Sequence, residues 1–301
     1  MKRLILPVLL SIAVLAGVQG CMSCQCAGGK SATCACAGAA SEEPRISVFA
    51  AYIRRIAKER GISKAEAAEL LYGMGVRGFD AGPGEEDLDE LAATSLKPIN
   101  FYYFPDWFGR KDKAKTVSPE ACLLRAEKLG VPRIMVVPPH FTDGVDNPGE
   151  FEKILAHMKE FVAEAKRRSI TVTVEDFGGT ANCCSYAKYL KRFLNEIPDL
   201  RFALDAGNMY YAGRGEDILD MMEFAKGRIG HVHLKDLSAK NNHEYVTLGL
   251  GAVPNEKVVK TIGATGYDGW YTLETPVGNV YNDSVRQVAL LKAWLAEANQ
   301  P

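Results

Sequence analysis

Four apolar segments in the second half of the chain carry side chains that are suited to binding a metal. TVTVE ends at Glu175, FALD ends at Asp205, WYTLE ends at Glu274, and HVHL contains His231 and His233. Carboxylate oxygens and imidazole nitrogens form a ligand set that suits Mn²⁺, Mg²⁺, Co²⁺ or Zn²⁺ and leaves positions for a substrate. A carboxylate at a strand end often caps a helix or joins a salt bridge instead. The same pattern in four successive segments favours a divalent-metal site.

Strand-like and helix-like segments alternate from about residue 44 to the C-terminus, as in an α/β protein. The strand-like runs are Ile46–Ala50, Val76–Asp80, Ile99–Phe104, Arg133–Pro138, Thr171–Glu175, Arg201–Asp205, Gly230–Leu234 and Trp270–Glu274. The helix-like runs are Ser63–Tyr72, Pro119–Leu129, Glu150–Arg167, Tyr186–Asn195, Ile218–Ala225, Asn255–Ile262 and Asp283–Glu297. This alternation over about 250 residues predicts a (β/α)8 TIM barrel, whose strand ends meet at one mouth. A doubly wound open sheet is the alternative, but no GxGxxG follows the first strand to support it.

Four motifs, taken in order, resemble one family of barrels. They are GVRGFD ending at Asp80, HVHLKD at 231–236, LGLGAVP at 248–254, and GYDGW at 266–270, which leads to Glu274. Together they resemble the xylose isomerase-like barrel superfamily of sugar isomerases, epimerases, inosose dehydratases and endonuclease IV. The likeness covers residues 46–296, so it implies that residues 44–301 form one TIM barrel domain.

The resemblance implies a ligand set and a mechanism. By position, Glu175, Asp205, His233 and Glu274 would be the metal ligands, and His231 would lie one layer deeper in the barrel. Glu175 and Glu274 would also be the two catalytic carboxylates, one removing a carbon-bound proton and the other returning it. A hydride shift and an elimination of water remain open alternatives.

Four side chains that follow predicted strands are candidates for substrate contacts. His140 follows strand four, with a packed loop histidine as the alternative, and Lys235 could contact a substrate oxygen or a metal-bound carboxylate. Asp80 is a candidate for binding a hydroxyl group or for a salt bridge. Trp107 belongs to an aromatic run that could stack on a sugar ring or pack in the core.

Asn208 is a fifth candidate for substrate binding, and it departs from the family pattern. Many relatives carry His three residues after the aspartate of strand six, which here is Asp205. An asparagine can hydrogen-bond a sugar hydroxyl but cannot act as a base. It also removes a ligand that the multi-zinc members use, and this weakens the endonuclease interpretation.

The charge balance bears on the choice of partner. The chain has 301 residues, 36 basic and 37 acidic side chains, and a net charge of −1. Proteins that bind nucleic acid through its phosphates usually carry a basic surplus, so a nucleic-acid partner is disfavoured. We expect a small carbohydrate substrate and a metal-dependent sugar isomerase or epimerase. A keto-sugar or cyclitol dehydratase or lyase, and a non-catalytic sugar-binding lipoprotein, are the alternatives.

The N-terminal sequence predicts export. Lys2 and Arg3 precede the apolar run Leu4–Val18, so residues 1–20 read as a signal peptide. Cys21 follows a sequence similar to a bacterial lipobox, and ordinary cleavage after Gly20 is the alternative. Residues 21–43 form a linker rich in Cys, Gly and Ala, for which disulfides or no structure are favoured over a metal site. We expect a protein of the periplasm or cell envelope, with a lipid anchor at Cys21 as its one contact with the membrane.

Overall fold

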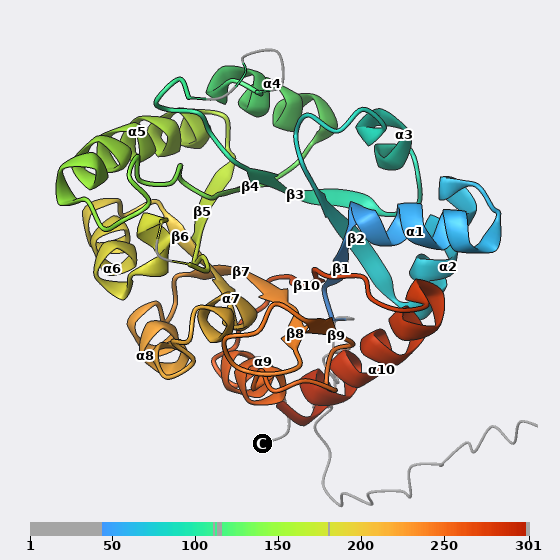
Figure 1. The fold of residues 1–301 in the computed structure, drawn as a ribbon. Coiled ribbons are helices and arrows are strands. Elements are labelled where there is room, and N and C mark those ends of the chain that lie inside the picture. The colour runs from blue at the N-terminus through green and yellow to red at the C-terminus, as the bar shows by residue number, and fades with distance from the viewer. Residues whose placement is uncertain (1–43, 111, 113–115, 180, 299–301) are drawn as a thin grey trace, which may run out of the picture. The chain divides into compact units, whose positions relative to one another are not determined.

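Eight parallel strands close into a barrel surrounded by helices (Figure 1). A computed structural model describes residues 44–298 except 111, 113–115 and 180. The strand order around the barrel is β1-β2-β3-β4-β5-β6-β7-β10, and β10 closes on β1. The prediction of a (β/α)8 TIM barrel is therefore confirmed. The predicted signal peptide and the cysteine-rich linker lie outside the described residues.

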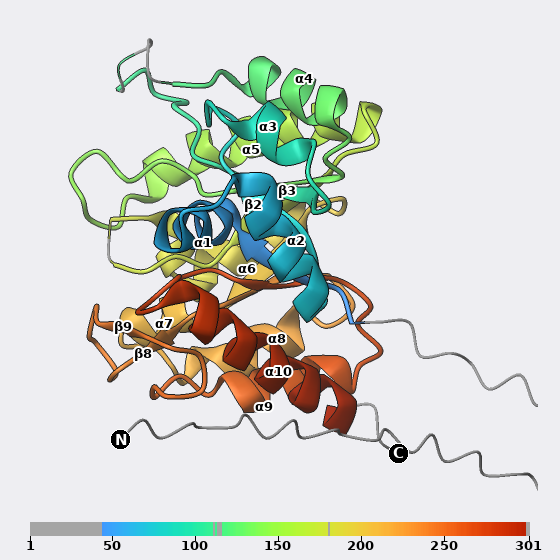
Figure 2. The ribbon, with the colours of Figure 1, turned by 90° about the vertical axis from the view of Figure 1, so that its right-hand side faces the viewer.

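The elements follow the predicted alternation, with shifts of a few residues at their ends. The barrel strands are β1 (Ile46–Phe49), β2 (Val76–Ala81), β3 (Lys97–Tyr103), β4 (Arg133–Val136), β5 (Thr171–Glu175), β6 (Arg201–Asp205), β7 (Ile229–Leu234) and β10 (Tyr271–Leu273). The helices are α1 (Ala50–Arg60), α2 (Lys64–Met74), α3 (Leu88–Ala92), α4 (Pro119–Leu129), α5 (Pro148–Arg167), α6 (Ala187–Glu196), α7 (Ala206–Tyr211), α8 (Asp217–Phe224), α9 (Asn255–Gly263) and α10 (Val280–Ala298). The last helix, α10, packs beside α1 and α2, so the two ends of the domain are joined (Figures 1 and 2).

The predicted ranges did not include helices α1, α3 and α7 or strands β8 and β9, and α3 has only 5 residues. Helix α1 begins directly after β1, without a side-chain cap at Phe49 that would mark its start. Helix α7 has 6 residues and starts at Ala206, immediately after β6, with Asp205 as its N-cap. A two-stranded antiparallel pair, β8 (Asp236–Leu237) and β9 (Tyr245–Val246), follows β7. Strands of 2 residues are too short to show a hydrophobic period.

Helix α4 begins with a serine cap followed by a proline, as expected from the sequence. The Oγ of Ser118 accepts a hydrogen bond from the backbone N–H of Ala121 at 3.2 Å, and Pro119 occupies the first turn. Replacing Ser118 by alanine leaves that N–H without its partner, so we expect the free energy of unfolding to fall by about 1 kcal/mol. Urea denaturation of the two proteins measures this difference. An unchanged midpoint and slope would contradict the assigned cap.

The space between the barrel and its helices is apolar, whereas much of the barrel interior is polar. Many TIM barrels fill their interior with branched aliphatic side chains. Here six polar side chains inside the barrel are fully buried: Ser47, Asp80, Asn100, Thr173, His231 and Thr272. Buried polar groups are stable only when they are hydrogen-bonded, so these six side chains should form a hydrogen-bonded network. Such a network holds the side chains at the barrel mouth in fixed positions. None of the helices in the described part of the chain is long and apolar enough to cross a membrane.

Candidate metal centre

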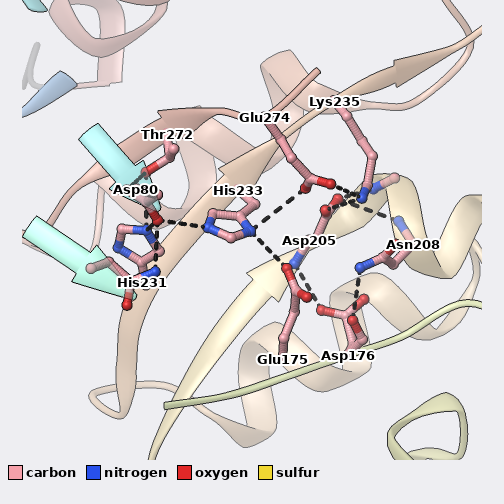
Figure 3. Close-up of polar contacts among 12 residues, drawn as sticks. Asp80, Glu175, Asp176, Asp205, Asn208, His231, His233, Lys235, Thr272 and Glu274 are labelled. Carbon is pink, nitrogen blue, oxygen red and sulfur yellow. Dashed lines mark hydrogen bonds and ion pairs between the residues drawn. The ribbon is translucent and has the colours of Figure 1, made fainter. Parts of the chain in front are cut away.

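Four ionisable side chains converge inside the mouth of the barrel (Figure 3). They are Glu175 at the end of β5, Asp205 at the end of β6, His233 in β7 and Glu274, which directly follows β10. Each offers a ligand atom within 4.8 Å of the ligand atoms of the other three. The first three are buried and Glu274 is half-buried, so the cluster opens toward solvent on the side of Glu274.

The imidazole of His233 lies between carboxylates on both sides. Its Nδ1 is 2.7 Å from Oε1 of Glu175 and 3.6 Å from Oε2 of Glu274. Its Nε2 points the other way and is 3.1 Å from Oδ2 of Asp80. Burial alone would lower the pKa of His233, but the neighbouring carboxylates outweigh it and raise the pKa above its usual value. Nδ1 is thus the nitrogen that faces the cluster.

Asp205 has two functions at once, because its two oxygens face different partners. Oδ1 accepts hydrogen bonds from the backbone N–H groups of Gly207 at 2.8 Å and Asn208 at 3.3 Å, which caps helix α7. Oδ2 faces Nζ of Lys235 at 2.8 Å. The helix cap, which was the alternative to a ligand at this position, is therefore compatible with a place in the cluster.

Lys235 bridges two of the four cluster residues. Its ammonium lies 2.8 Å from Oδ2 of Asp205 and 2.6 Å from Oε1 of Glu274. Burial would raise the pKa of Glu274, but the ammonium outweighs it and lowers that pKa to about 2. Burial would likewise lower the pKa of Lys235, and the carboxylates raise it instead. Of the two contacts expected for Lys235, the structure shows the one with carboxylates.

Replacing Lys235 by methionine should destabilise the metal-free protein. Two buried or half-buried carboxylates would then face each other without their shared cation, and losing one partner of a buried ion pair costs about 3–5 kcal/mol. The exposed Lys240, 2.8 Å from Glu216, is the matched control, and Lys240→Met should change stability by no more than about 0.5 kcal/mol. Urea denaturation in EDTA measures both variants. Equal stabilities of the two variants would contradict a structural ion pair at Lys235.

The cluster fits a divalent cation by its donors and by a buried carboxylate oxygen that accepts no hydrogen bond. Oε2 of Glu274 is buried and has no hydrogen-bond partner, although most buried polar atoms have one. Three carboxylates and one imidazole match the hard-to-borderline donor preferences of Mg²⁺, Mn²⁺, Co²⁺ and Zn²⁺. Glu175, Asp205, His233 and Glu274 are therefore the residues that would hold such an ion.

A wall of aromatic side chains borders the cluster. The ring of Phe49 meets the ring of His233 edge-on, with centroids 5.1 Å apart, and stacks on Tyr102 at 5.0 Å. Phe104 continues the wall from Tyr102 to Phe177, with both centroid distances at 6.5 Å. Sequence reasoning did not select Phe49 or Phe177. Phe49 ends β1, and Phe177 lies two residues after Glu175, which ends β5. These positions at strand ends could have indicated both residues from the sequence.

Two of the substrate candidates pack against different aromatic partners: His140 meets Phe177, and Trp107 stacks on His157. His140 is exposed, and its ring lies 6.0 Å from that of Phe177, at the outer part of the aromatic wall. Trp107 lies beside α5. It stacks on His157 of α5 at 5.6 Å and lines a surface groove of about 490 Å³ with residues of α4 and α5. Trp107 is partly buried and packed against the core, which agrees with the packing alternative and gives no support to a substrate contact.

Asp80 and Asn208 are buried and hydrogen-bond within the protein. Asp80 has no exposed surface, and its carboxylate accepts hydrogen bonds from side chains below the cluster. The amide Nδ2 of Asn208 donates to the backbone carbonyl of Asp176 at 2.8 Å, so it ties the β6–α7 junction to the end of β5. For Asp80 the structure shows the salt-bridge alternative, with His231 and His233 as its partners. For Asn208 it shows a structural contact through Nδ2.

The loop after β7 is organised by Asp236. Its carboxylate accepts backbone hydrogen bonds from Gly249 at 2.9 Å, Gly251 at 3.1 Å and Val253 at 3.1 Å. A Cβ on Gly251 would lie 2.2 Å from Oδ1 of Asp236, so this position requires glycine. The LGLGAVP motif thus serves the loop geometry that follows Lys235, and Asp236 is a structural residue.

Comparison with known proteins is consistent with this geometry. Residues 55–298 match the family model described as the xylose isomerase-like TIM barrel. A curated inosose dehydratase from Yersinia enterocolitica is 25% identical over 154 residues, which span 45% of this chain and 49% of the relative. The match thus covers about half the length of that protein.

Solved structures share the fold at low sequence identity. A probable 3-DHS dehydratase from Bacillus anthracis superposes with a TM-score of 0.67 and 16% identity, covering 82% of this chain and 98% of the other. A D-tagatose 3-epimerase-like protein gives a TM-score of 0.65 and 16% identity, covering 85% of this chain and 98% of the other.

Proposed function

Since the chain belongs to the xylose isomerase-like TIM barrel family, we propose that it is a metal-dependent sugar isomerase or epimerase. Its reaction would move a proton at a carbon atom next to the carbonyl group of a keto-sugar. The observation that carries the proposal is the convergence of two glutamates on one histidine inside the barrel mouth.

Glu175 and Glu274 are the two proton-transferring groups in this proposal. They approach His233 Nδ1 at 2.7 Å and 3.6 Å from different strands, so a substrate carbon above the cluster can meet a carboxylate on each face. One carboxylate removes the proton and the other returns it, which gives an isomer or an epimer. When bound, a divalent cation would polarise the carbonyl group next to the reacting carbon.

The aromatic wall supports a carbohydrate as the substrate. Phe49 contacts the ring of His233, so the wall begins directly at the cluster rather than at a distance from it. The C–H faces of sugar rings are apolar and pack on aromatic rings, while their hydroxyl groups remain available to polar groups. Tyr102 and Phe104 extend this surface toward solvent, since Phe104 is 46% exposed.

A dehydratase acting on a keto-sugar or cyclitol is the second candidate. The sequence match to inosose dehydratase favours it, and the reaction begins with the same removal of a proton next to a carbonyl. The second carboxylic acid would then protonate a departing hydroxyl group instead of carbon. The two candidates use the same residues and differ in the product.

Product analysis separates the candidates. Mn²⁺-loaded protein is incubated with a panel of ketohexoses, keto-glucosides and keto-inositols, and the products are identified by NMR and mass spectrometry. A product of unchanged mass supports the isomerase or epimerase, and a product lighter by one water supports the dehydratase. Sugar binding without turnover by protein that has bound the metal would support the non-catalytic alternative and refute both enzymes.

Export remains part of the proposal on sequence grounds alone. The basic pair Lys2 and Arg3, the apolar run after it and Cys21 support a signal that directs the protein to the periplasm or cell envelope. Mass spectrometry of the native N-terminus tests this. A lipidated Cys21 or a cleaved terminus supports export, and an intact Met1 refutes it.

A further inference from the structure

We propose that Asp80 is a positioning residue, which holds the ring of His233 so that Nδ1 is presented to the metal. The inference rests on the proposed function, because it takes His233 to be a ligand. Asp80 comes from β2, which lies across the barrel from β5, β6 and β7 and is separated from β10 by β1. Figure 3 shows its carboxylate on the side of His233 opposite Glu175 and Glu274.

The contacts of Asp80 are all inside the protein. Its Oδ2 lies 2.7 Å from Nδ2 of Asn100, 2.8 Å from Nε2 of His231 and 3.1 Å from Nε2 of His233. Its Oδ1 lies 3.3 Å from the hydroxyl of Thr272. All five side chains have no more than 1% exposed surface. This carboxylate is therefore held by a complete set of protein donors and has no surface to offer a substrate.

The neighbours of His231 show which of these atoms donate hydrogen bonds and which accept them. The guanidinium of Arg133 can only donate, and its Nη1 is 3.3 Å from Nδ1 of His231. Nδ1 of His231 is then the acceptor, so the ring carries its hydrogen on Nε2 and donates it to Asp80. Oδ2 of Asp80, which also faces the donating Nδ2 of Asn100 at 2.7 Å, is consequently an acceptor before His233 is considered.

An acceptor at this position determines which nitrogen of His233 carries hydrogen. Nε2 of His233 faces Oδ2 of Asp80 and must donate, since an ionised carboxylate accepts only. Without a metal, Nδ1 can donate to Oε1 of Glu175 at 2.7 Å; a bound metal would take the place of that hydrogen and meet the lone pair of Nδ1 on the side of Glu175 and Glu274. A carboxylate that accepts from the remote nitrogen fixes the tautomer and the ring orientation of a metal-binding histidine, and its loss typically weakens metal binding by 10–100-fold.

The first test compares metal affinity in three proteins. Mn²⁺ is titrated calorimetrically into the wild-type protein, Asp80→Asn and Ser47→Ala. Ser47 lies in the same buried layer, and its hydroxyl is 2.6 Å from that of Thr272, so it is a matched control that removes a buried hydrogen bond not made by Asp80 or His233. We expect affinity to fall about 10–100-fold in Asp80→Asn and to be unchanged in Ser47→Ala. Equal affinities in all three proteins would overturn the inference.

A second measurement needs no variant, so it remains decisive if Asp80→Asn does not fold. Long-range ¹H–¹⁵N spectra of Zn²⁺-loaded wild-type protein with labelled histidine report which nitrogen of His233 carries hydrogen. We expect hydrogen on Nε2 and none on Nδ1, and the reverse would overturn the inference. If Mn²⁺ and Zn²⁺ do not bind the wild-type protein at all, the proposed function fails first, and this result is distinct from either outcome above.

Discussion

Replacing Glu274 by glutamine should lower kcat on the substrate that emerges from the product screen by about 10²–10⁴-fold. Glutamine keeps the shape of the side chain and a carbonyl oxygen for the metal, but it cannot accept a proton from carbon at neutral pH. Steady-state kinetics with saturating Mn²⁺ measure the effect. Glu256→Gln, an exposed substitution on α9, is the control and should leave kcat unchanged.

Glu175→Gln should give a loss of similar size but need not fail at the same step. If each carboxylate serves one face of the substrate, the variant that keeps the proton-removing group still exchanges the carbon-bound proton with solvent while forming no product. The other variant shows neither exchange nor product. Full activity of Glu274→Gln with the metal still bound would refute the assignment of two catalytic carboxylates.

Asp205→Asn should weaken binding of the divalent metal by more than about 100-fold, beyond the loss expected for a partner that does not touch the ion. The substitution removes the charge that faces Lys235 and the cluster, yet asparagine can still cap α7 through the oxygen that accepts from Gly207. Calorimetric titration of Mn²⁺ tests affinity, and thermal melts in EDTA test whether the cap is kept. Asp220→Asn, an exposed site on α8, is the control.

Two outcomes of that titration decide the role of Asp205. Weakened binding by a protein that melts near the wild-type temperature identifies Asp205 as a ligand. Wild-type affinity for Mn²⁺ would restrict Asp205 to its capping role and remove one side chain from the proposed metal centre.

The fold and the cluster could be predicted because they depend on patterns that are local in the sequence. Apolar runs separated by amphipathic helices determine a parallel barrel, and a parallel barrel brings its strand ends to one mouth. Glu175, Asp205 and Glu274 stand at or directly after strand ends, so their convergence follows from topology alone. His233 was separable from His231 because residues two apart face the same way but lie at different depths.

The positions at which the sequence left two alternatives depend on partners that are remote in the sequence. Asp80 lies at the end of β2, much as Asp205 lies at the end of β6. The carboxylate of Asp80, however, meets His231 and His233 of β7 across the barrel. Trp107 follows β3 as part of an aromatic run, and the path of the loop carries it to α5. Sequence patterns indicate which strand end a residue follows. They do not show whether a side chain from another element already hydrogen-bonds or packs against that residue.

Exchange of the hydrogen next to the carbonyl with solvent would show directly that this site removes a proton from carbon. Mn²⁺-loaded protein is incubated in D₂O with the keto-sugars of the screen, and NMR follows the signal of the hydrogen next to the carbonyl. The account predicts deuterium at that carbon, no incorporation after EDTA, and recovery when Mn²⁺ is restored. Turnover with complete retention of the original hydrogen would contradict it, and would point to a hydride shift in place of carboxylate-mediated proton transfer.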